Sequence, residues 1–264
     1  MSSARSSRTL IELSRVSKEE SLPRGRSRAL LKDVSWSLRE GQKLAVFSDV
    51  NKSANALLEC VSEVTAPQSG KVKVRANVSW PLPSRGGLEG VMTGRQNSKF
   101  LHAVYGTPGQ EREQIARIEE LSSFAPGCFD QRMKSWSPLM RARFDVALSL
   151  VFDFDVYVVC KRFPWSQPVR PELESLVREA FERRVANKTL LLFHQDEEFL
   201  ARYCDEAIVI SDCRIVYQGA FAEAQQWFRL NAEKSGSEDD SMDQEIEDSS
   251  PEPAEESFEE VELW

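Results

Sequence analysis

Apolar and polar residues alternate in two N-terminal stretches, and this period of two predicts β-strands at residues 9–16 and 29–47. Within the second stretch, residues 39–42 supply a turn before a buried strand at 43–47. The polar segment Ser17–Ser27 between the stretches is expected to be a loop. After residue 47 a short loop precedes 54–64, where apolar residues recur at helical spacing. Strand, loop and helix in this order is the arrangement of a phosphate-binding unit.

The period changes in the middle of the chain. Residues 71–80 alternate again and predict a strand, and Leu82–Gly90 is rich in Pro and Gly, which is typical of a connection. From 93 to 150 the pattern is mostly helical. This long helical stretch predicts an insertion into whatever sheet the strands form.

Continuous apolar strands alternate with helices in the second half. Such strands, rich in β-branched residues, are typical of parallel sheets covered on both faces. The predicted strands are Asp155–Cys160, Lys188–Phe193, Ala207–Ile210 and Arg214–Gln218, and the predicted helices are Glu172–Val185 and Phe221–Leu230. The fold class is therefore α/β, a layered domain with a helical insertion.

The C-terminal segment 231–264 differs from the rest in charge. It holds fourteen Asp and Glu against one Lys, so the net charge of −8 conceals a body of +5 over residues 1–230. A segment with so few apolar residues does not offset its ordering entropy, and we expect it to be a disordered acidic tail. Its expected role is solvation, or weak ionic contact with one of two basic groups. These groups are Arg24, Arg26 and Arg28, or Lys161 and Arg162.

Other features of the sequence limit the classes of partner, the cysteine chemistry and the location that we expect. No Lys/Arg run is interleaved with aromatic residues, so we expect no nucleic acid. Five scattered cysteines form no Cys-x-x-Cys pair, which favours reduced thiols over a disulfide framework or a metal site. The arginine-bearing stretch 1–8 is followed by no apolar region, and no apolar run approaches the ~20 residues that span a bilayer. We expect a disordered N-terminus, a cytoplasmic protein, and membrane contact only through a partner.

Five strings, in this order and spacing, carry a family resemblance. They are residues 78–81 (VSWP), 86–90 (GGLEG), 93–97 (TGRQN), 152–159 (FDFDVYVV) and 204–209 (CDEAIV). From about residue 9 to 230 the chain resembles the ATP-binding subunits of capsular polysaccharide exporters, within the ATP-binding-cassette family. The resemblance implies an ABC-type nucleotide-binding domain over 9–230, with a RecA-like core, a small antiparallel β-subdomain and a helical subdomain at about 93–150. It also implies a head-to-tail dimer, in this case a possible homodimer, and a membrane permease docked near Leu82–Asn97.

The phosphate-binding loop is degenerate. A P-loop needs glycines whose backbone N–H groups surround the phosphates, a lysine that reaches the terminal phosphates, and a hydroxyl that holds magnesium. Residues 48–56 read SDVNKSANA. Aligned without gaps, Ser48, Asn51 and Ser53 replace the glycines, Ala54 replaces the lysine and Asn55 replaces the hydroxyl. In a second frame, shifted by two, Lys52 and Ser53 are the lysine and the hydroxyl, but no glycine remains in the loop. Asp49 adds a negative charge where a triphosphate would lie.

The other family motifs are also changed. Cys160, Lys161 and Arg162 follow the strand that should end in the Walker B carboxylates, and the long cations are expected to extend to solvent. The family's signature loop, Ser-Ser-Gly, resembles Ser137-Pro138-Leu139 in this chain, so Leu139 replaces the glycine. Pro138 still suits the first turn of a helix.

The nucleotide-contacting positions differ as well. Ser17 or Lys18 stands near the position of the adenine-stacking aromatic, Ser84 near that of the Q-loop glutamine, and Phe163–Ser166 at that of the D-loop. His194 alone matches its motif, the switch histidine, as a vestigial catalytic residue or a hydrogen-bonded structural one. His102 has no motif around it and is expected to be a surface or a packing residue.

These residues predict a pseudo-ATPase with the shape of a cassette. It would bind a polysaccharide-export permease or an active ATPase subunit, and act at the inner face of the cytoplasmic membrane as a scaffold or regulator. No cofactor is expected, and ATP with Mg²⁺ would bind only if the family activity survives. Two alternatives stay open: a weakly active ATP-binding subunit that uses Lys52 and His194, and a soluble interaction protein that reuses the fold.

Overall fold

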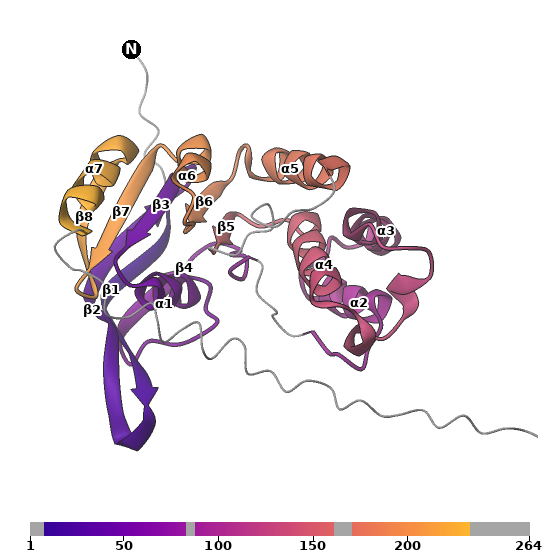
Figure 1. Ribbon diagram of the computed structural model, residues 1–264, viewed down its shortest axis with the longest axis horizontal. Helices are drawn as coiled ribbons and strands as arrows, with labels where there is room; N and C mark the ends of the chain where they lie inside the picture. Colours follow the sequence, from indigo (N-terminus) through magenta and orange to yellow (C-terminus); the bar gives the residue numbers. More distant parts are fainter. Residues whose placement is uncertain (1–7, 83–87, 161–170, 233–264) are drawn as a thin grey trace, which may run out of the picture.

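The computed structural model describes residues 8–82, 88–160 and 171–232, which form two sheets flanked by helices (Figure 1). The strands are β1 (Thr9–Leu22), β2 (Arg26–Arg39), β3 (Lys43–Ser48), β4 (Ser69–Val74), β5 (Val156–Val159), β6 (Thr189–Leu192), β7 (Glu206–Ser211) and β8 (Arg214–Ala220). The helices are α1 (Asn51–Val61), α2 (Gly94–Tyr105), α3 (Glu111–Ser122), α4 (Pro138–Val151), α5 (Pro171–Val185), α6 (Glu197–Tyr203) and α7 (Phe221–Ala232). The α/β class predicted from the sequence is confirmed.

A long β-hairpin replaces the polar loop expected at Ser17–Ser27, and that prediction is wrong. β1 and β2 stay paired up to Leu22 and Arg26, where a single 3-10 turn at Pro23–Gly25 reverses the chain (Figure 1). We call residues 17–28 the arm. The arm has no sheet packed against its outer part, so polar residues occupy both faces and the strand pattern is hidden.

The five-stranded sheet carries the core. Its order is β5-β6-β3-β7-β8; the first four strands are parallel, and β8 is antiparallel to β7. Side chains alternate across it: Leu44 and Val46 belong to the cluster with α1 and the β1–β2 sheet, whereas Ala45 and Phe47 belong to the cluster with α4 to α7. The sheet is thus covered on both faces, which explains the continuous apolar strands.

The strand predicted at 71–80 divides into two parts. β4 ends at Val74 in the antiparallel sheet β2-β1-β4. Asn77 then turns the chain, since its backbone N–H donates to Asp155 at 2.9 Å and its side-chain amide donates to the Asp153 carbonyl at 3.0 Å. Beyond it, Val78 and Leu82 form parallel bridges to β5. The alternating pattern continues because both parts are extended, but they lie in different sheets.

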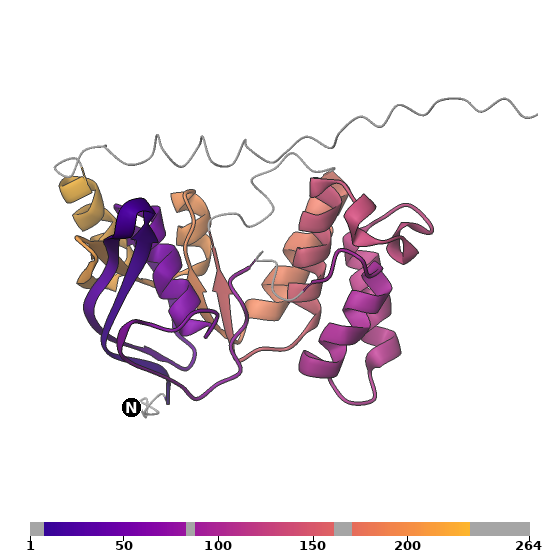
Figure 2. The ribbon, with the colours of Figure 1, turned by 90° about the horizontal axis from the view of Figure 1, so that it is seen from below.

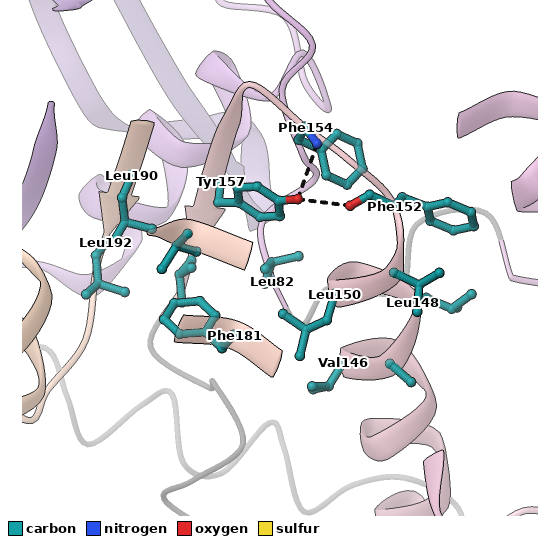
Figure 3. Packing of buried hydrophobic residues seen from close by; sticks show 14 of the residues in the cluster. Leu82, Val146, Leu148, Leu150, Phe152, Phe154, Tyr157, Phe181, Leu190 and Leu192 are labelled. Atoms are coloured by element: carbon teal, nitrogen blue, oxygen red, sulfur yellow. Dashed lines mark hydrogen bonds between the residues drawn. The ribbon is translucent and has the colours of Figure 1, made fainter. Parts of the chain in front are cut away.

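α2, α3 and α4, with two short 3-10 turns, form a helical unit beside β5 (Figure 2). The unit joins the sheet through an aromatic and aliphatic core around Tyr157, whose hydroxyl donates to the Phe152 carbonyl at 2.9 Å and accepts from the Phe154 N–H at 3.2 Å (Figure 3). Every helix in the described part of the chain is too short or too polar to cross a lipid bilayer.

Two helices differ from the sequence expectations. α1 begins at Asn51 and ends at Val61, earlier than the predicted 54–64, and α6 was not predicted. α6 follows an N-cap, Asp196, whose carboxylate accepts from the N–H groups of Glu198 and Phe199. The division into a nucleotide-binding domain at 9–230 and two disordered ends stays a prediction, and residues 1–7 and 233–264 lie outside the described residues.

Candidate functional site

The β3–α1 loop and His194, two of the features singled out in the sequence, lie at one edge of the five-stranded sheet. In parallel strands the carboxyl ends meet at the same edge, where ligands bind in open α/β sheets. β3 ends at Ser48, His194 follows β6, and Ser211 ends β7. The degenerate loop and the histidine therefore belong to one region, as the family resemblance implies.

The connection from β3 to α1 is very short. Only Asp49 and Val50 separate the last residue of β3 from the first residue of α1. The Ser48 hydroxyl donates to the Val50 carbonyl at 2.8 Å, and the N–H groups of Ser53 and Ala54 donate to the same carbonyl at 3.0 and 3.4 Å. A phosphate-binding loop needs several residues, glycines among them, to turn its N–H groups inward. Here only two residues, without glycine, lie between the strand and the helix, and the bonds to the Val50 carbonyl are the first bonds of α1.

Asp49 is held by the neighbouring β7–β8 turn. Its carboxylate oxygen Oδ2 accepts from the Ser211 hydroxyl at 2.7 Å and from the Asp212 N–H at 3.4 Å, and its own N–H donates to the Ile210 carbonyl at 3.3 Å. The other oxygen, Oδ1, is buried without a partner. A negative charge is thereby fixed at the position where the resemblance would place a polyphosphate.

Lys52 contacts the arm. Its ammonium lies 3.3 Å from both carboxylate oxygens of Glu20, and about a third of each side chain is exposed. In the second alignment frame Lys52 is the phosphate-binding lysine. In the structure its charge is paired with a carboxylate of the same chain.

Glu20 was missed because the arm was expected to be a loop. The available signal was Pro23-Arg24-Gly25, a short turn with Gly between two stretches that face each other with complementary charge. In the observed register Glu20 lies directly opposite Arg28.

The remaining loop positions are buried in the helix rather than presented to a ligand. Ala54, at the lysine position of the ungapped alignment, is fully buried in the core cluster. Ser53 is 1% exposed and its hydroxyl has no partner. Asn55, at the magnesium-hydroxyl position, is half-buried on α1. None of these three side chains supplies the charge that a P-loop lysine supplies.

His194 is a buried histidine with contacts to the first residues of α6. It is 8% exposed, its Nδ1 accepts from the Asp196 N–H at 3.0 Å, and its ring lies 4.7 Å from that of Phe199. Burial lowers the pKa of His194, against a smaller opposing effect of the Asp196 carboxylate. Its Nε2 is buried and has no hydrogen-bond partner among the described residues. The ring is in contact with residues at the start of α6, and its role as a vestigial or a structural histidine stays a prediction.

The segment at the signature position serves its own helix. The Ser137 hydroxyl accepts from the Met140 N–H at 3.2 Å and so caps α4, and Pro138 lies in the first turn as predicted. Leu139 is 42% exposed beside it. The hydroxyl is therefore engaged in capping, and a bulky side chain stands where the family has glycine.

Other predicted positions are described in part or not at all. Lys18 is buried, and its ammonium donates to the Thr65 hydroxyl at 2.6 Å, away from any aromatic stacking role. Cys160 follows β5. Ser84, Lys161, Arg162 and residues 163–166 lie outside the described residues. His102 is a packing residue, with its Nδ1 2.8 Å from Gln114 Oε1.

Comparison with known proteins identifies relatives along most of the chain. The Escherichia coli polysialic acid transport ATP-binding protein KpsT is 27% identical over 207 residues, 78% of this chain and 90% of that protein. The capsule polysaccharide export ATP-binding protein CtrD of Neisseria meningitidis serogroup B is 27% identical over 76% of this chain and 90% of its own length. BexA, an ATP-binding protein of Haemophilus influenzae, is 26% identical over 70% of this chain and 82% of its own length. No protein-family model matches the chain.

Solved structures agree on the fold. The post-hydrolysis dimer of the ATP-binding cassette MJ0796, bound to ADP and Pi, has a TM-score of 0.64 at 13% identity, covering 80% of this chain and 99% of that one. An ATP-binding subunit of an ABC transporter has a TM-score of 0.65 at 16% identity, covering 90% and 100%. The chain therefore has the ATP-binding-cassette fold and is a homologue of the ATP-binding subunits of capsular polysaccharide exporters.

Proposed function

We propose that this chain is a cassette-shaped pseudo-ATPase that serves polysaccharide export as a scaffold or regulator, bound to a permease or to an active ATPase subunit. One observation carries the proposal: the turn at the phosphate-binding position is short, and the lysine that follows it is already paired. Only two residues, neither of them glycine, separate β3 from α1, and the ammonium of Lys52 is paired with the carboxylate of Glu20.

The residues present do not fit ATP with magnesium. Hydrolysis needs a lysine on the terminal phosphates, a hydroxyl and carboxylates for the metal, and a group that activates water. Asp49 would instead face the phosphates with a like charge. Each loss removes a separate contribution to transition-state stabilisation, so restoring one residue alone has no effect.

An apolar strip on α2 supports the partner assignment. Phe100 is 50% exposed and Val104 is 60% exposed, and Tyr105 stacks edge-on against Trp80 at 5.2 Å. Val91, just before α2, is 66% exposed. Exposed apolar patches of this kind are typical of protein contacts. We assign the strip, together with the neighbouring segment Leu82–Asn97, to the permease, so that membrane contact is through that partner and the chain is peripheral at the inner face of the cytoplasmic membrane.

A second candidate is a weakly active ATP-binding subunit. It is favoured by the presence of Lys52 at the turn and by the buried His194 ring, whose Nε2 has no hydrogen-bond partner among the described residues. It requires the arm to release Lys52, because an ammonium bound to Glu20 has less charge to offer a phosphate.

Calorimetric titration with Mg-ATP, together with an ATPase assay, tests the proposal. We expect no micromolar binding and no turnover above background. The quadruple change Asn51→Gly, Ser53→Gly, Ala54→Lys and Asn55→Ser should at most recover binding, and its thermal unfolding checks that lysine at the buried position 54 is tolerated. Micromolar binding by the unmodified chain, with magnesium-dependent turnover that His194→Ala abolishes, would refute the pseudo-ATPase and establish the second candidate.

Crosslinking in membranes that contain the permease tests the partner. We expect crosslinks to Phe100 and Val104 replaced singly by a photoreactive residue, and none from Val216, an exposed apolar residue on β8 that provides a matched control. Crosslinks that map to β8 instead would reject this surface.

A further inference from the structure

A polar cavity lies between the helical unit and α5. Its volume is about 550 Å³, and it is open to solvent. α3 and α5 line it together with the end of α4, and in both ribbon views α5 lies beside α4 at the end of the molecule away from α7 (Figures 1 and 2). We call this cavity the basin. Its charged residues are Arg117, Arg183, Arg184 and Lys188, against Glu113 and Asp153.

Two of the four cations form the floor of the basin. Arg184 donates through Nε to the Leu150 carbonyl at 2.9 Å and through Nη2 to the Val151 carbonyl at 3.0 Å, which caps the end of α4. Arg184 and Lys188 also share Asp153, at 3.3 and 3.0 Å from its Oδ1. This arrangement ties α5 to α4, and the two cations with their shared carboxylate carry one net positive charge.

The other two cations are Arg117 on α3 and Arg183 on α5. Arg117 pairs with Glu120 one helical turn away at 2.6 Å, a contact on the surface of α3. Arg183 is exposed and makes no ion pair or hydrogen bond with the residues that the structure describes. Exposed ion pairs contribute at most about 1 kcal/mol, so an incoming carboxylate can replace Glu120 at little cost. The basin therefore presents exchangeable cations over a positive floor.

We propose that the basin binds the acidic C-terminal segment of this same chain, residues 233–264. The segment carries fourteen acidic residues against one lysine, and it begins directly after α7 ends at Ala232. Its 32 residues reach roughly 100 Å when extended. A concave site lined by cations concentrates the attraction of such a segment more than a convex surface does.

The rival surface is the arm, with Arg24, Arg26 and Arg28. There the cations stand on a two-stranded ribbon exposed to solvent, and Arg28 is opposite Glu20 in the register. Solvent and salt weaken attraction to such a ribbon most. We therefore assign the segment to the basin, where it would cover the junction of α3, α4 and α5.

Zero-length carbodiimide crosslinking of the full chain separates the two surfaces. Arg183→Lys and Arg24→Lys keep the charge and each add one crosslinkable amine to its surface, besides the amine of Lys188 that the basin already holds. At low salt we expect crosslinks from position 183 to residues 233–264 at a yield about fivefold above those from position 24, and their loss near 1 M salt, where the screening length is about 3 Å. Thermal unfolding of both variants checks that the fold is intact.

Two results would overturn the proposal: crosslinks that favour position 24, or no crosslink from either position. A mixture of ¹⁵N-labelled and unlabelled chains distinguishes the chain's own segment from that of a second copy. Crosslinked peptides of one isotope composition support the proposal, and mixed pairs contradict it.

Small-angle X-ray scattering provides an independent readout on the full chain. We expect the radius of gyration to rise with salt in the unmodified chain. The double variant Arg117→Gln, Arg183→Gln should already be expanded at low salt, whereas the charge-matched control Arg24→Gln, Arg26→Gln should stay compact. Equal behaviour of the two double variants would reject the basin as the binding site.

Discussion

The residues of β3 pack in the core, whereas the residues of the turn that follows it are partly exposed and make hydrogen bonds to neighbouring elements. Leu44 to Phe47 are at most 4% exposed, and each packs into one of the two core clusters. The next residues, from Ser48 to Val50, are only partly buried and bond to the β7–β8 turn and to α1. The strand keeps the cassette fold, while Ser48 to Val50 of the turn include neither glycine nor lysine.

The difference between the strand and its turn indicates that the fold depends on the buried strand residues rather than on the loop residues. Burial of continuous apolar strands stabilises the sheet whatever follows them, and many side chains satisfy that requirement. A phosphate cradle depends on a few glycines and a lysine at fixed positions. Chains can therefore share a fold at 13% identity, while loop chemistry changes without cost to the core.

The largest expected effect tests the core side of this contrast. Tyr157→Ala in β5 should destabilise the chain by about 3–5 kcal/mol, because it leaves a cavity and frees the Phe154 N–H and Phe152 carbonyl. Tyr157→Phe, the matched control, keeps the ring and should cost about 1–2 kcal/mol. Urea unfolding measures both. A cost below about 1 kcal/mol for Tyr157→Ala would break the contrast.

Gly94→Ala tests whether the helical unit is packed as tightly as the sheet. A methyl group at Gly94 would lie 2.6 Å from Cη2 of Trp136, a residue that is 3% exposed and has little room to move. We expect a loss of about 1–3 kcal/mol. Gly90→Ala is the control, since its nearest neighbour would be 3.9 Å away. Equal unfolding midpoints for the two variants would show that the unit is loosely packed.

Much of the fold could be predicted from the sequence because burial leaves a strong pattern. β3, β5 and β6 are fully covered strands, and each was found within one or two residues. The arm was missed because a ribbon exposed on both faces shows no apolar alternation. α6 was missed because seven residues are too few to establish a helical period.

The site could be predicted only in part. Loss of the loop glycines is visible in the sequence, and so is His194. The residues that pair with the loop could not be predicted, because Glu20 contacts Lys52 and Ser211 contacts Asp49 from segments distant in the sequence. The shortened turn was not predicted either, since local spacing did not reveal that α1 begins at Asn51.

The pH dependence of the free energy of unfolding tests how tightly His194 is held at the edge of the sheet. Burial lowers the pKa of His194 below its ordinary value of 6.5, so the unfolded chain binds the proton more readily. Its contribution to stability is therefore fully present above pH 6.5 and is lost as the pH falls from there towards the folded-state pKa. Asp196 and the ring of Phe199 are the groups facing it.

His194→Phe should weaken this dependence. We expect the thermal midpoint of the unmodified chain to fall more between pH 7.5 and 5.5 than that of the variant, and the two curves to run parallel above about pH 7. Differential scanning calorimetry measures the midpoints. Parallel curves throughout would show that the histidine is solvated rather than held.

The smallest expected effect concerns the ion pair beside the turn. Glu20 and Lys52 are each about one-third exposed, so their coupling in a double-mutant cycle of Glu20→Gln and Lys52→Gln should be at most about 1 kcal/mol. Glu19→Gln is the control, because the hydrogen bonds between Glu19 and Gln68 are made by the backbone of Glu19 and not by its carboxylate. Salt should reduce the coupling further. If the coupling exceeds about 2 kcal/mol, the turn is held by the arm rather than by its own bonds, and the edge of the sheet is as tightly specified as the core.

The same Glu20→Gln variant, titrated with Mg-ATP, shows whether releasing Lys52 is enough to allow a phosphate to bind. We expect no binding, since the two-residue turn is unchanged.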